Sequence, residues 1–140
     1  MENVKNNTSS LADSKTLAES IAFVLIEKKA LDVTMYNVSE ESSITDYYIN
    51  ATGRSSTNVA SLADEVTYKI GLMGRDALRV EGRQGNSWLL VDYGDVIVNI
   101  FDKPSREFYN FDRLLPETAN VDISNIISEV DKKYSIEKED

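Results

Sequence analysis

The segment Trp88-Leu89-Leu90-Val91-Asp92-Tyr93-Gly94-Asp95-Val96-Ile97-Val98-Asn99-Ile100-Phe101 joins two apolar runs through a compact acidic turn. Each run is rich in Val, Ile and aromatic residues, which fit a pleated, half-buried surface, and each is about as long as one strand. The turn Asp92-Tyr93-Gly94-Asp95 places Gly94 third, where a type II turn needs a positive φ that glycine adopts without steric cost. The segment therefore predicts a β-hairpin whose register is fixed by Gly94.

The composition is that of a soluble globular domain. With 140 residues, of which 41% are hydrophobic and 28% charged, the chain can bury a core of its own. It has no cysteine and no histidine, which excludes disulfides, thiolate chemistry, the usual general base and the commonest metal ligand. Catalysis would have to rest on carboxylates, Tyr, Lys or water. We therefore expect neither an enzyme nor a cofactor or metal.

The net charge of −9 comes from 24 acidic and 15 basic residues. Because phosphate backbones are bound mainly through Lys and Arg, an acidic chain that works near nucleic acid is expected to dock on a basic protein. No apolar run approaches the roughly 18 to 20 residues that span a bilayer. The first ten residues hold no apolar signal-peptide core. We expect a cytoplasmic protein that does not contact a membrane.

Hydrophobic periodicity predicts the order α-β-β-α-β-β-β-α, followed by an amphipathic helix. This order favours an α/β (α+β) fold with one mixed five-stranded sheet and flanking helices. We expect a parallel crossover between Tyr47 and Arg83, and Ile44 to be tucked inward from a polar linker. The expected elements are a helix from Asp13 or Ser14 to Lys29, strands over 31–38 and 47–52, a helix from Ser55 or Ser56 to Met73, a strand over 78–83, the hairpin strands, a short helix over 106–115 and a helix after Val121.

The domain prediction has three parts. Residues 1–12 are polar and aperiodic and are expected to be a flexible N-terminus. Residues 13–116 form the domain, and residues 117–140 form a C-terminal extension with an amphipathic helix and an acidic tail. That extension is expected to cover the domain, lengthen a dimer interface or add steric bulk.

Two motifs could carry chemistry, and each has a simpler interpretation. The turn Thr52-Gly53-Arg54-Ser55-Ser56 opens a helix and could hold a phosphate, but it lacks the full glycine-rich motifs, so an ordinary helix cap is favoured. Asp92 and Asp95 could hold a divalent ion, as in a metal-dependent nucleotidyltransferase-like enzyme. They bracket a turn, however, and no third carboxylate is placed by spacing, so a turn-stabilising pair or a docking patch is favoured over this alternative.

Aromatic and charged residues gather in and beside the hairpin. Most aromatics that alternate along strands face a core. Two long helices cannot bury both faces of the sheet, so some of these side chains are expected on an open face, and aromatic and Arg side chains are typical of protein interfaces. The residues concerned are Tyr47, Trp88, Tyr93, Phe101, Arg106 and Tyr109.

Between Leu17 and Leu115 the chain resembles the ribosomal silencing factor family, also called the Iojap family. The resemblance rests on the order and spacing of several runs, of which the hairpin is the longest. These runs are Ser42-Ser43-Ile44-Thr45-Asp46-Tyr47-Tyr48-Ile49, Ala51-Thr52-Gly53-Arg54-Ser55-Ser56, Val80-Glu81-Gly82, the hairpin from Trp88 to Val98, and Arg106-Glu107-Phe108-Tyr109.

The resemblance implies a fold similar to nucleotidyltransferases without their activity. It implies binding to the large ribosomal subunit through the ribosomal protein numbered fourteen, with a minor contact to ribosomal RNA. Bound there, the factor would block association with the small subunit and repress translation when nutrients are limiting. The resemblance also implies a homodimer when the protein is free.

The resemblance further implies a docking surface made by the hairpin and the helix that follows it. Two positions depart from the family pattern: Asn99 stands where members usually have His, and Leu115 where they usually have Trp. Asn99 keeps a hydrogen-bonding group but does not titrate, and Leu115 lacks a large flat anchor. The partner-binding residues implied are Asp46, Tyr47, Trp88, Asp92, Tyr93, Asp95, Asn99, Phe101, Arg106 and Tyr109.

Overall fold

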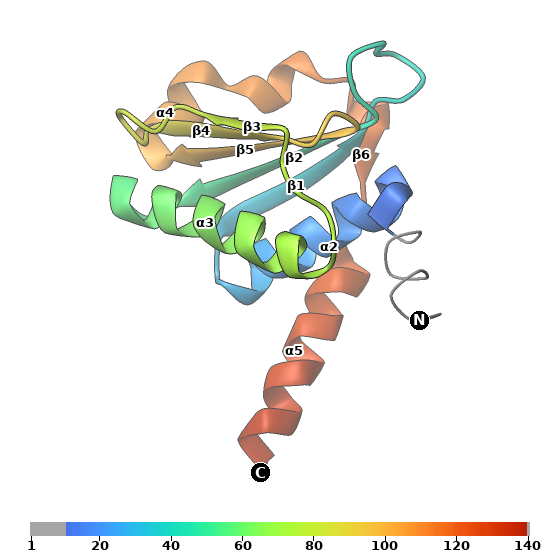
Figure 1. The fold of residues 1–140 in the computed structure, drawn as a ribbon, viewed down its shortest axis with the longest axis vertical. Coiled ribbons are helices and arrows are strands. Elements are labelled where there is room, and N and C mark those ends of the chain that lie inside the picture. The colour runs from blue at the N-terminus through green and yellow to red at the C-terminus, as the bar shows by residue number, and fades with distance from the viewer. Residues whose placement is uncertain (1–10, 140) are drawn as a thin grey trace.

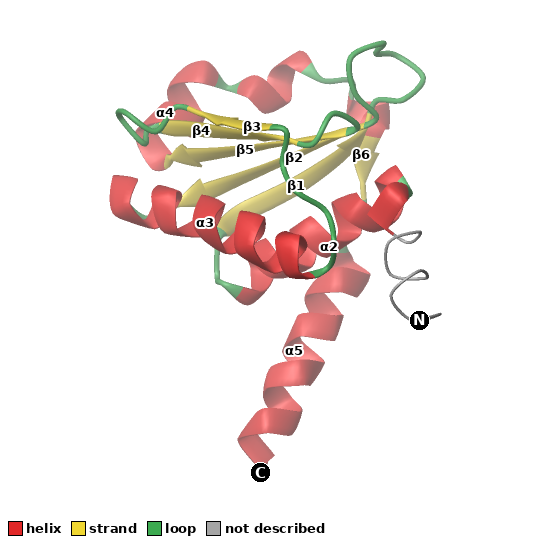
Figure 2. Cartoon of the chain, viewed as in Figure 1, coloured by secondary structure: helices red, strands yellow, loops and turns green. Residues whose placement is uncertain are grey.

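A mixed sheet of six strands, in the order β3-β4-β5-β2-β1-β6, forms the centre of the fold. It is seen in a computed structural model that describes residues 11–139, with side chains described through residue 135. Helices α2 and α3 cover one face of the sheet, and α4 with the segment after it lies over the other face (Figure 1). Helix α5 begins against α2 and extends away from the body (Figure 2).

The bounds of the elements agree closely with those expected from periodicity. The predicted fold class is confirmed, with six strands in place of five because the two-residue β6 pairs with β1. The helices are α2 (Ser14–Glu27), α3 (Ser56–Leu72), α4 (Lys103–Tyr109) and α5 (Ser124–Glu139), with 3-10 helices η1 (Phe111–Leu114) and η2 (Glu117–Ala119). The strands are β1 (Leu31–Asn37), β2 (Tyr47–Gly53), β3 (Arg79–Glu81), β4 (Trp88–Asp92), β5 (Val96–Asp102) and β6 (Asn120–Val121).

Helices α2 and α3 begin at the predicted caps. The Asp13 carboxylate accepts a hydrogen bond from the Thr16 backbone N–H at 3.1 Å, and the Ser55 hydroxyl accepts one from the Asn58 N–H at 3.1 Å. Such bonds satisfy backbone donors that have no partner inside the helix. The apolar stripes of α2 and α3 then bury residues such as Leu17 against the sheet.

The predicted hairpin is confirmed. Strands β4 and β5 pair antiparallel, with Trp88 opposite Phe101 at one end and Asp92 opposite Ile97 at the other. Gly94 has a φ of 91°, in the left-handed region that favours glycine. Its backbone N–H donates to Asp92 Oδ1 at 2.7 Å, so the turn is also held by a side chain.

Alternation along the strands gives the sheet two different faces. On β2, Ile49 and Ala51 belong to the core beneath α2 and α3, whereas Asn50 and Thr52 point to the opposite face. The same alternation separates core residues from polar and aromatic residues on β1, β4 and β5. We call the side away from α2 and α3 the open face.

One expectation about the chain path is confirmed: β2 pairs in parallel with β5, and β3 pairs with β4, so the crossover from β2 through α3 to β3 joins parallel strands, which are not neighbours in the sheet. Two other expectations need correction. Ile44 is 74% exposed and not tucked inward. The expected helix over 106–115 starts at Lys103 and ends at Tyr109, because Asn110 adopts the left-handed conformation.

The two ends of the chain extend the expected domain. Leu11, which was expected to belong to the flexible N-terminus, is buried in the core. The rest of that segment, residues 1–10, lies outside the described part of the chain, as does Asp140 at the end of the predicted acidic tail. Ile126 and Val130 of α5 are buried as well. Among the described residues, no helix is long and apolar enough to cross a membrane.

Candidate docking surface

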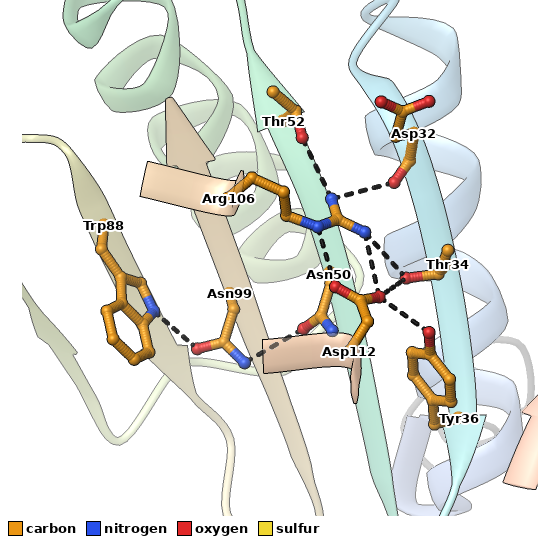
Figure 3. A network of polar contacts seen from close by, with 9 residues as sticks. All are labelled: Asp32, Thr34, Tyr36, Asn50, Thr52, Trp88, Asn99, Arg106 and Asp112. Atoms are coloured by element: carbon orange, nitrogen blue, oxygen red, sulfur yellow. Dashed lines mark hydrogen bonds and ion pairs between the residues drawn. The ribbon is translucent and has the colours of Figure 1, made fainter. Parts of the chain in front are cut away.

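An ion pair ties α4 and η1 to the open face of the sheet. Arg106 donates from Nε to Asp112 Oδ1 at 2.8 Å and from Nη2 to Asp112 Oδ2 at 3.0 Å (Figure 3). The same guanidinium donates to the hydroxyl of Thr52 on β2 and of Thr34 on β1, at 3.0 and 3.2 Å, and the hydroxyls of Thr34 and Tyr36 donate to Asp112. A bidentate pair of this kind fixes direction as well as distance. We call this set of residues the Arg106 clamp.

The clamp shifts the ionisation of two of its members. Burial opposes ionisation of Asp112, but the hydrogen bonds from Arg106, Tyr36 and Thr34 and the charge of Arg106 outweigh it and lower its pKa to about 2. Burial raises the pKa of Tyr36, and its hydrogen bond to Asp112 raises it further. Asp112 is therefore a carboxylate over the physiological pH range, and Tyr36 remains a hydrogen-bond donor.

A second polar chain crosses the sheet beside the clamp. Trp88 Nε1 donates to Asn99 Oδ1 at 3.0 Å, and Asn99 Nδ2 donates to Asn50 Oδ1 at 3.1 Å (Figure 3). Asn99 is 1% exposed and Asn50 is fully buried. Asn50 Nδ2 has no hydrogen-bond partner among the described residues. The two hydrogen bonds from Trp88 through Asn99 to Asn50 orient the Trp88 ring from beneath.

Aromatic rings form a continuous cluster above these polar groups. The Trp88 ring centroid lies 4.9 Å from that of Phe101, 4.8 Å from Tyr109 and 6.3 Å from Phe111. Phe108 stacks edge-on against Tyr109 at 5.0 Å and is 81% exposed. These distances are in the range of favourable aromatic pairs. Trp88, Phe101, Phe108, Tyr109 and Phe111 are called the open-face aromatic cluster below.

The ten residues implied by the resemblance do not form one surface. The structure brings five together on the open face, at the end of the hairpin away from its turn. The other five lie at the turn end, where the Asp46 and Tyr47 N–H groups both donate to the Asp95 carbonyl oxygen. Trp88 and Asp92, at the two ends of β4, are four residue steps apart, a distance of about 13 Å. The first group is Trp88, Asn99, Phe101, Arg106 and Tyr109, and the second is Asp46, Tyr47, Asp92, Tyr93 and Asp95.

Burial divides the predicted residues further. Phe101 and Asn99 are buried beneath the open-face aromatic cluster, whereas Tyr93 is 1% exposed and belongs to the core at the turn end of the hairpin. Burial raises the pKa of Tyr93 strongly, as expected for a core tyrosine. Tyr109 is 50% exposed, and Trp88 is half-buried. Binding by any of these residues stays a prediction.

Asp92 and Asp95 are each engaged by a different arginine. Asp92 Oδ2 accepts from Arg79 Nε at 3.1 Å, and Asp95 Oδ1 accepts from Arg75 Nη2 at 2.6 Å. In the described part of the chain, no group of three or more His, Cys, Asp or Glu residues is placed to hold a metal. The two carboxylates therefore hold the hairpin turn and the loop before β3 in place, which is one of the two interpretations that the sequence favoured; a docking patch stays a prediction.

Backbone N–H groups in and after the glycine turn before α3 donate to the side chains that cap this helix. The Asn58 side chain accepts from the Arg54 N–H at 2.8 Å while Ser55 accepts from the Asn58 N–H. A Cβ on Gly53 would lie 2.8 Å from Val59 Cγ2. The glycine thus permits close packing of β2 on α3, as an ordinary strand-to-helix cap would require.

Sequence reasoning missed two parts of this site. Phe108 is the most exposed ring of the cluster, and its only signal is its place between Glu107 and Tyr109 in an aromatic helix. The partners of Arg106 were also missed. Thr34 and Tyr36 alternate with the core positions of β1, and this alternation could have assigned them to the open face.

These observations define a small mixed α/β domain in which ion pairs hold loops and turns in place and aromatic side chains are exposed on one face. A family model described as "Ribosomal silencing factor during starvation" matches residues 11–140. The chain belongs to this family. The match runs through residues 117–140, beyond the Leu17 to Leu115 span of the resemblance seen in the sequence. The family name describes a regulator and not an enzyme.

Individual relatives agree with this assignment. The chain is 32% identical over 102 residues to "Ribosomal silencing factor RsfS" of Halalkalibacterium halodurans, covering 73% of this chain and 87% of the relative. It is 23% identical over 99 residues to "Mitochondrial assembly of ribosomal large subunit protein 1" of Mus musculus, covering 69% and 43%. A crystal structure of a Chromobacterium violaceum protein, 32% identical, gives a TM-score of 0.64 over 69% of this chain and 84% of that chain.

Proposed function

We propose that this protein binds the large ribosomal subunit through the ribosomal protein numbered fourteen and blocks association with the small subunit. Translation would then be repressed when nutrients are limiting. The family description supports the silencing role, and the mouse relative is named for the large ribosomal subunit. Such a mechanism needs affinity and bulk, without a chemical step.

The open-face aromatic cluster is the observation that carries the proposal. Phe108 and Tyr109 expose most and half of their surface respectively, and Leu114 on η1 is 75% exposed. Large aromatic side chains on a rigid element lose little conformational freedom on binding and are enriched among interface residues that dominate affinity. The Arg106 clamp supplies that rigidity, because it fixes α4 and η1 to two strands.

The charge of the chain fits a basic protein partner. At a net charge of −9, long-range attraction favours a positively charged surface. Lys103 and Arg113 are exposed near the two ends of the α4–η1 segment. Their exposure and positive charge support a minor contact with ribosomal RNA as part of the proposal. We also propose that free protein forms a homodimer, which would have to open if its interface overlaps the docking surface.

Co-sedimentation with isolated large and small subunits tests the proposal. We expect saturable binding to the large subunit alone, with fewer joined ribosomes. Phe108→Ala with Tyr109→Ala should weaken binding by about 2 kcal/mol or more, about thirtyfold. Tyr68→Ala is the matched control, because Tyr68 is a 62% exposed aromatic on α3, on the other side of the sheet. Normal binding by the double variant, or equal loss in the control, would contradict the proposed surface.

Charge reversal at Asp92 or Asp95 is a poorer test. A lysine at either position would face Arg79 or Arg75 and replace an ion pair that holds the turn or the loop with a like-charge contact. Loss of binding in these variants would not separate docking from folding. Phe108 avoids this difficulty because most of its surface is already in contact with solvent.

A further inference from the structure

Residues of α2, α5 and the end of α3 line a groove. These elements lie on the side of the sheet opposite α4 (Figure 1). Its volume is about 220 Å³, and its apolar lining comes from Phe23, Met73 and Ile126. Glu19 of α2 and Glu129 of α5 stand on its two walls. Met73 is 42% exposed, so apolar surface faces solvent here.

The walls of the groove are held in place by specific contacts. Ile126 and Val130 are buried where α5 packs on the body. Farther along, Lys133 forms an ion pair with the Glu27 carboxylate, and the Tyr134 hydroxyl donates to the Glu27 carbonyl oxygen at 3.1 Å. The end of α2 is thus fastened to α5, so the groove is a fixed feature of the surface.

The groove carries the negative charge of two carboxylates. In the part of the chain that the structure describes, neither Glu19 nor Glu129 takes part in a salt bridge. Lys133 lies 5.9 Å from the Phe23 ring centroid but is engaged with Glu27. By contrast, Glu65 on α3 lies within ion-pair distance of two lysines. An apolar floor between two unpaired carboxylates attracts a ligand that is itself apolar and cationic.

We propose that this groove binds a short segment of a protein partner in which an apolar side chain neighbours a Lys or Arg. The apolar side chain covers Phe23, Met73 and Ile126, and the cation reaches Glu19 or Glu129. The volume lies below the roughly 300 to 1,000 Å³ of small-molecule pockets, which favours one or two side chains over a whole metabolite. The groove is separate from the open-face aromatic cluster, so both surfaces can be occupied together, and the proposal does not rest on ribosome binding.

Fluorescence anisotropy with defined peptides tests the proposal on the full chain. The probe is a labelled peptide of alternating Lys and Leu, compared with peptides in which Ser replaces Leu or Glu replaces Lys. We expect binding of the Lys–Leu peptide alone. Glu19→Lys with Glu129→Lys should weaken it by about tenfold or more, since two attractive contacts become repulsive. Met73→Ser should weaken it through the lost apolar contact.

Glu40→Lys with Glu41→Lys is the matched control, because it makes the same change in net charge at exposed residues of a loop that does not line the groove. It should leave binding within about twofold, a change of less than 0.5 kcal/mol. Thermal melting checks that each variant folds. Equal weakening in both charge variants, or equal binding of the Leu-free peptide, would show general attraction to an acidic protein and overturn the proposal. No measurable binding of the Lys–Leu peptide would overturn it as well.

Discussion

Arg106 and Asp112 form a bidentate ion pair across the helix break at Asn110, with N–O distances of 2.8 and 3.0 Å. Asn110 takes φ and ψ of 48°, which ends α4, and the two side chains meet across this residue. The pair is mostly shielded from solvent, with 14% and 21% of the side-chain surfaces exposed. The exposed rings of the open-face aromatic cluster are therefore carried on a segment with a defined position.

Removing one member of this pair should destabilise the protein strongly. Arg106→Ala leaves the Asp112 carboxylate shielded from solvent without its cation, and we expect a loss of about 3 kcal/mol in the free energy of unfolding. Urea denaturation measures this loss. Lys103→Ala, which removes an exposed cation from the same helix, should change stability by less than about 0.5 kcal/mol. A loss below about 1 kcal/mol for Arg106→Ala would mean that solvent replaces the clamp.

The clamp should also make stability depend on acid pH. The folded pKa of Asp112, about 2, lies below its ordinary value of 3.8, so the unfolded chain binds the proton more readily. The contribution is complete above about pH 4 and is lost as the pH falls toward 2. Because the carboxyl keeps some solvent contact, we expect about 1 to 2 kcal/mol. Urea titrations at pH 4 and pH 2 measure the free energy of unfolding of wild-type protein and of Asp112→Asn. Between these two pH values the wild-type protein should lose more stability than the variant, by this amount. Equal losses in the two proteins would contradict the prediction.

The sequence predicted the fold well where a pattern is long and local. The stripes of α2 and α3 and the alternation of β2, β4 and β5 each extend over several residues, and the capping residues Asp13 and Ser55 mark both helix starts. Strand β6 has only two residues, so no periodicity exists to detect it. The break at Asn110 depends on one residue that also occurs inside helices, which explains why the helix was expected to continue to residue 115.

The site was harder to predict because it depends on which elements cover the open face. Hairpin residues such as Trp88 and Tyr93 are close in sequence but lie at opposite ends of a strand and differ in burial. The alternation along β5 correctly predicts that Phe101 points to the open face, but Phe101 is covered there by Trp88 and the Arg106 side chain. Whether a residue on that face is exposed is set by α4 and η1, whose position follows from long-range contacts that sequence spacing does not reveal.

Gly94 should be needed for its backbone conformation. Its φ of 91° is disfavoured for residues with a Cβ, and a Cβ there would lie 3.3 Å from Leu78 Cδ1. Gly94→Ala should reduce the free energy of unfolding by about 1 to 3 kcal/mol. Gly85→Ala serves as the control, because its Cβ would meet only Ser87 Oγ, at 4.0 Å. Equal effects in thermal or urea denaturation would show that the hairpin turn relaxes to accept a side chain.

Asn99→His places at this position the residue that the family resemblance implies, and it should introduce a pH response. A neutral imidazole can replace both hydrogen bonds of Asn99, accepting from Trp88 Nε1 and donating to Asn50 Oδ1. The site is 1% exposed, so burial should hold the histidine pKa below its unfolded value of about 6.5. The unfolded chain then binds the proton more readily, and stability should fall as the pH drops below about 6.5 toward 5. Urea denaturation at pH 7.5 and pH 5 measures this fall against wild-type protein, whose Asn99 does not titrate. A histidine variant equally stable at both pH values would mean that the imidazolium reaches solvent, and hence that the open face above Asn99 opens more readily than its packing indicates.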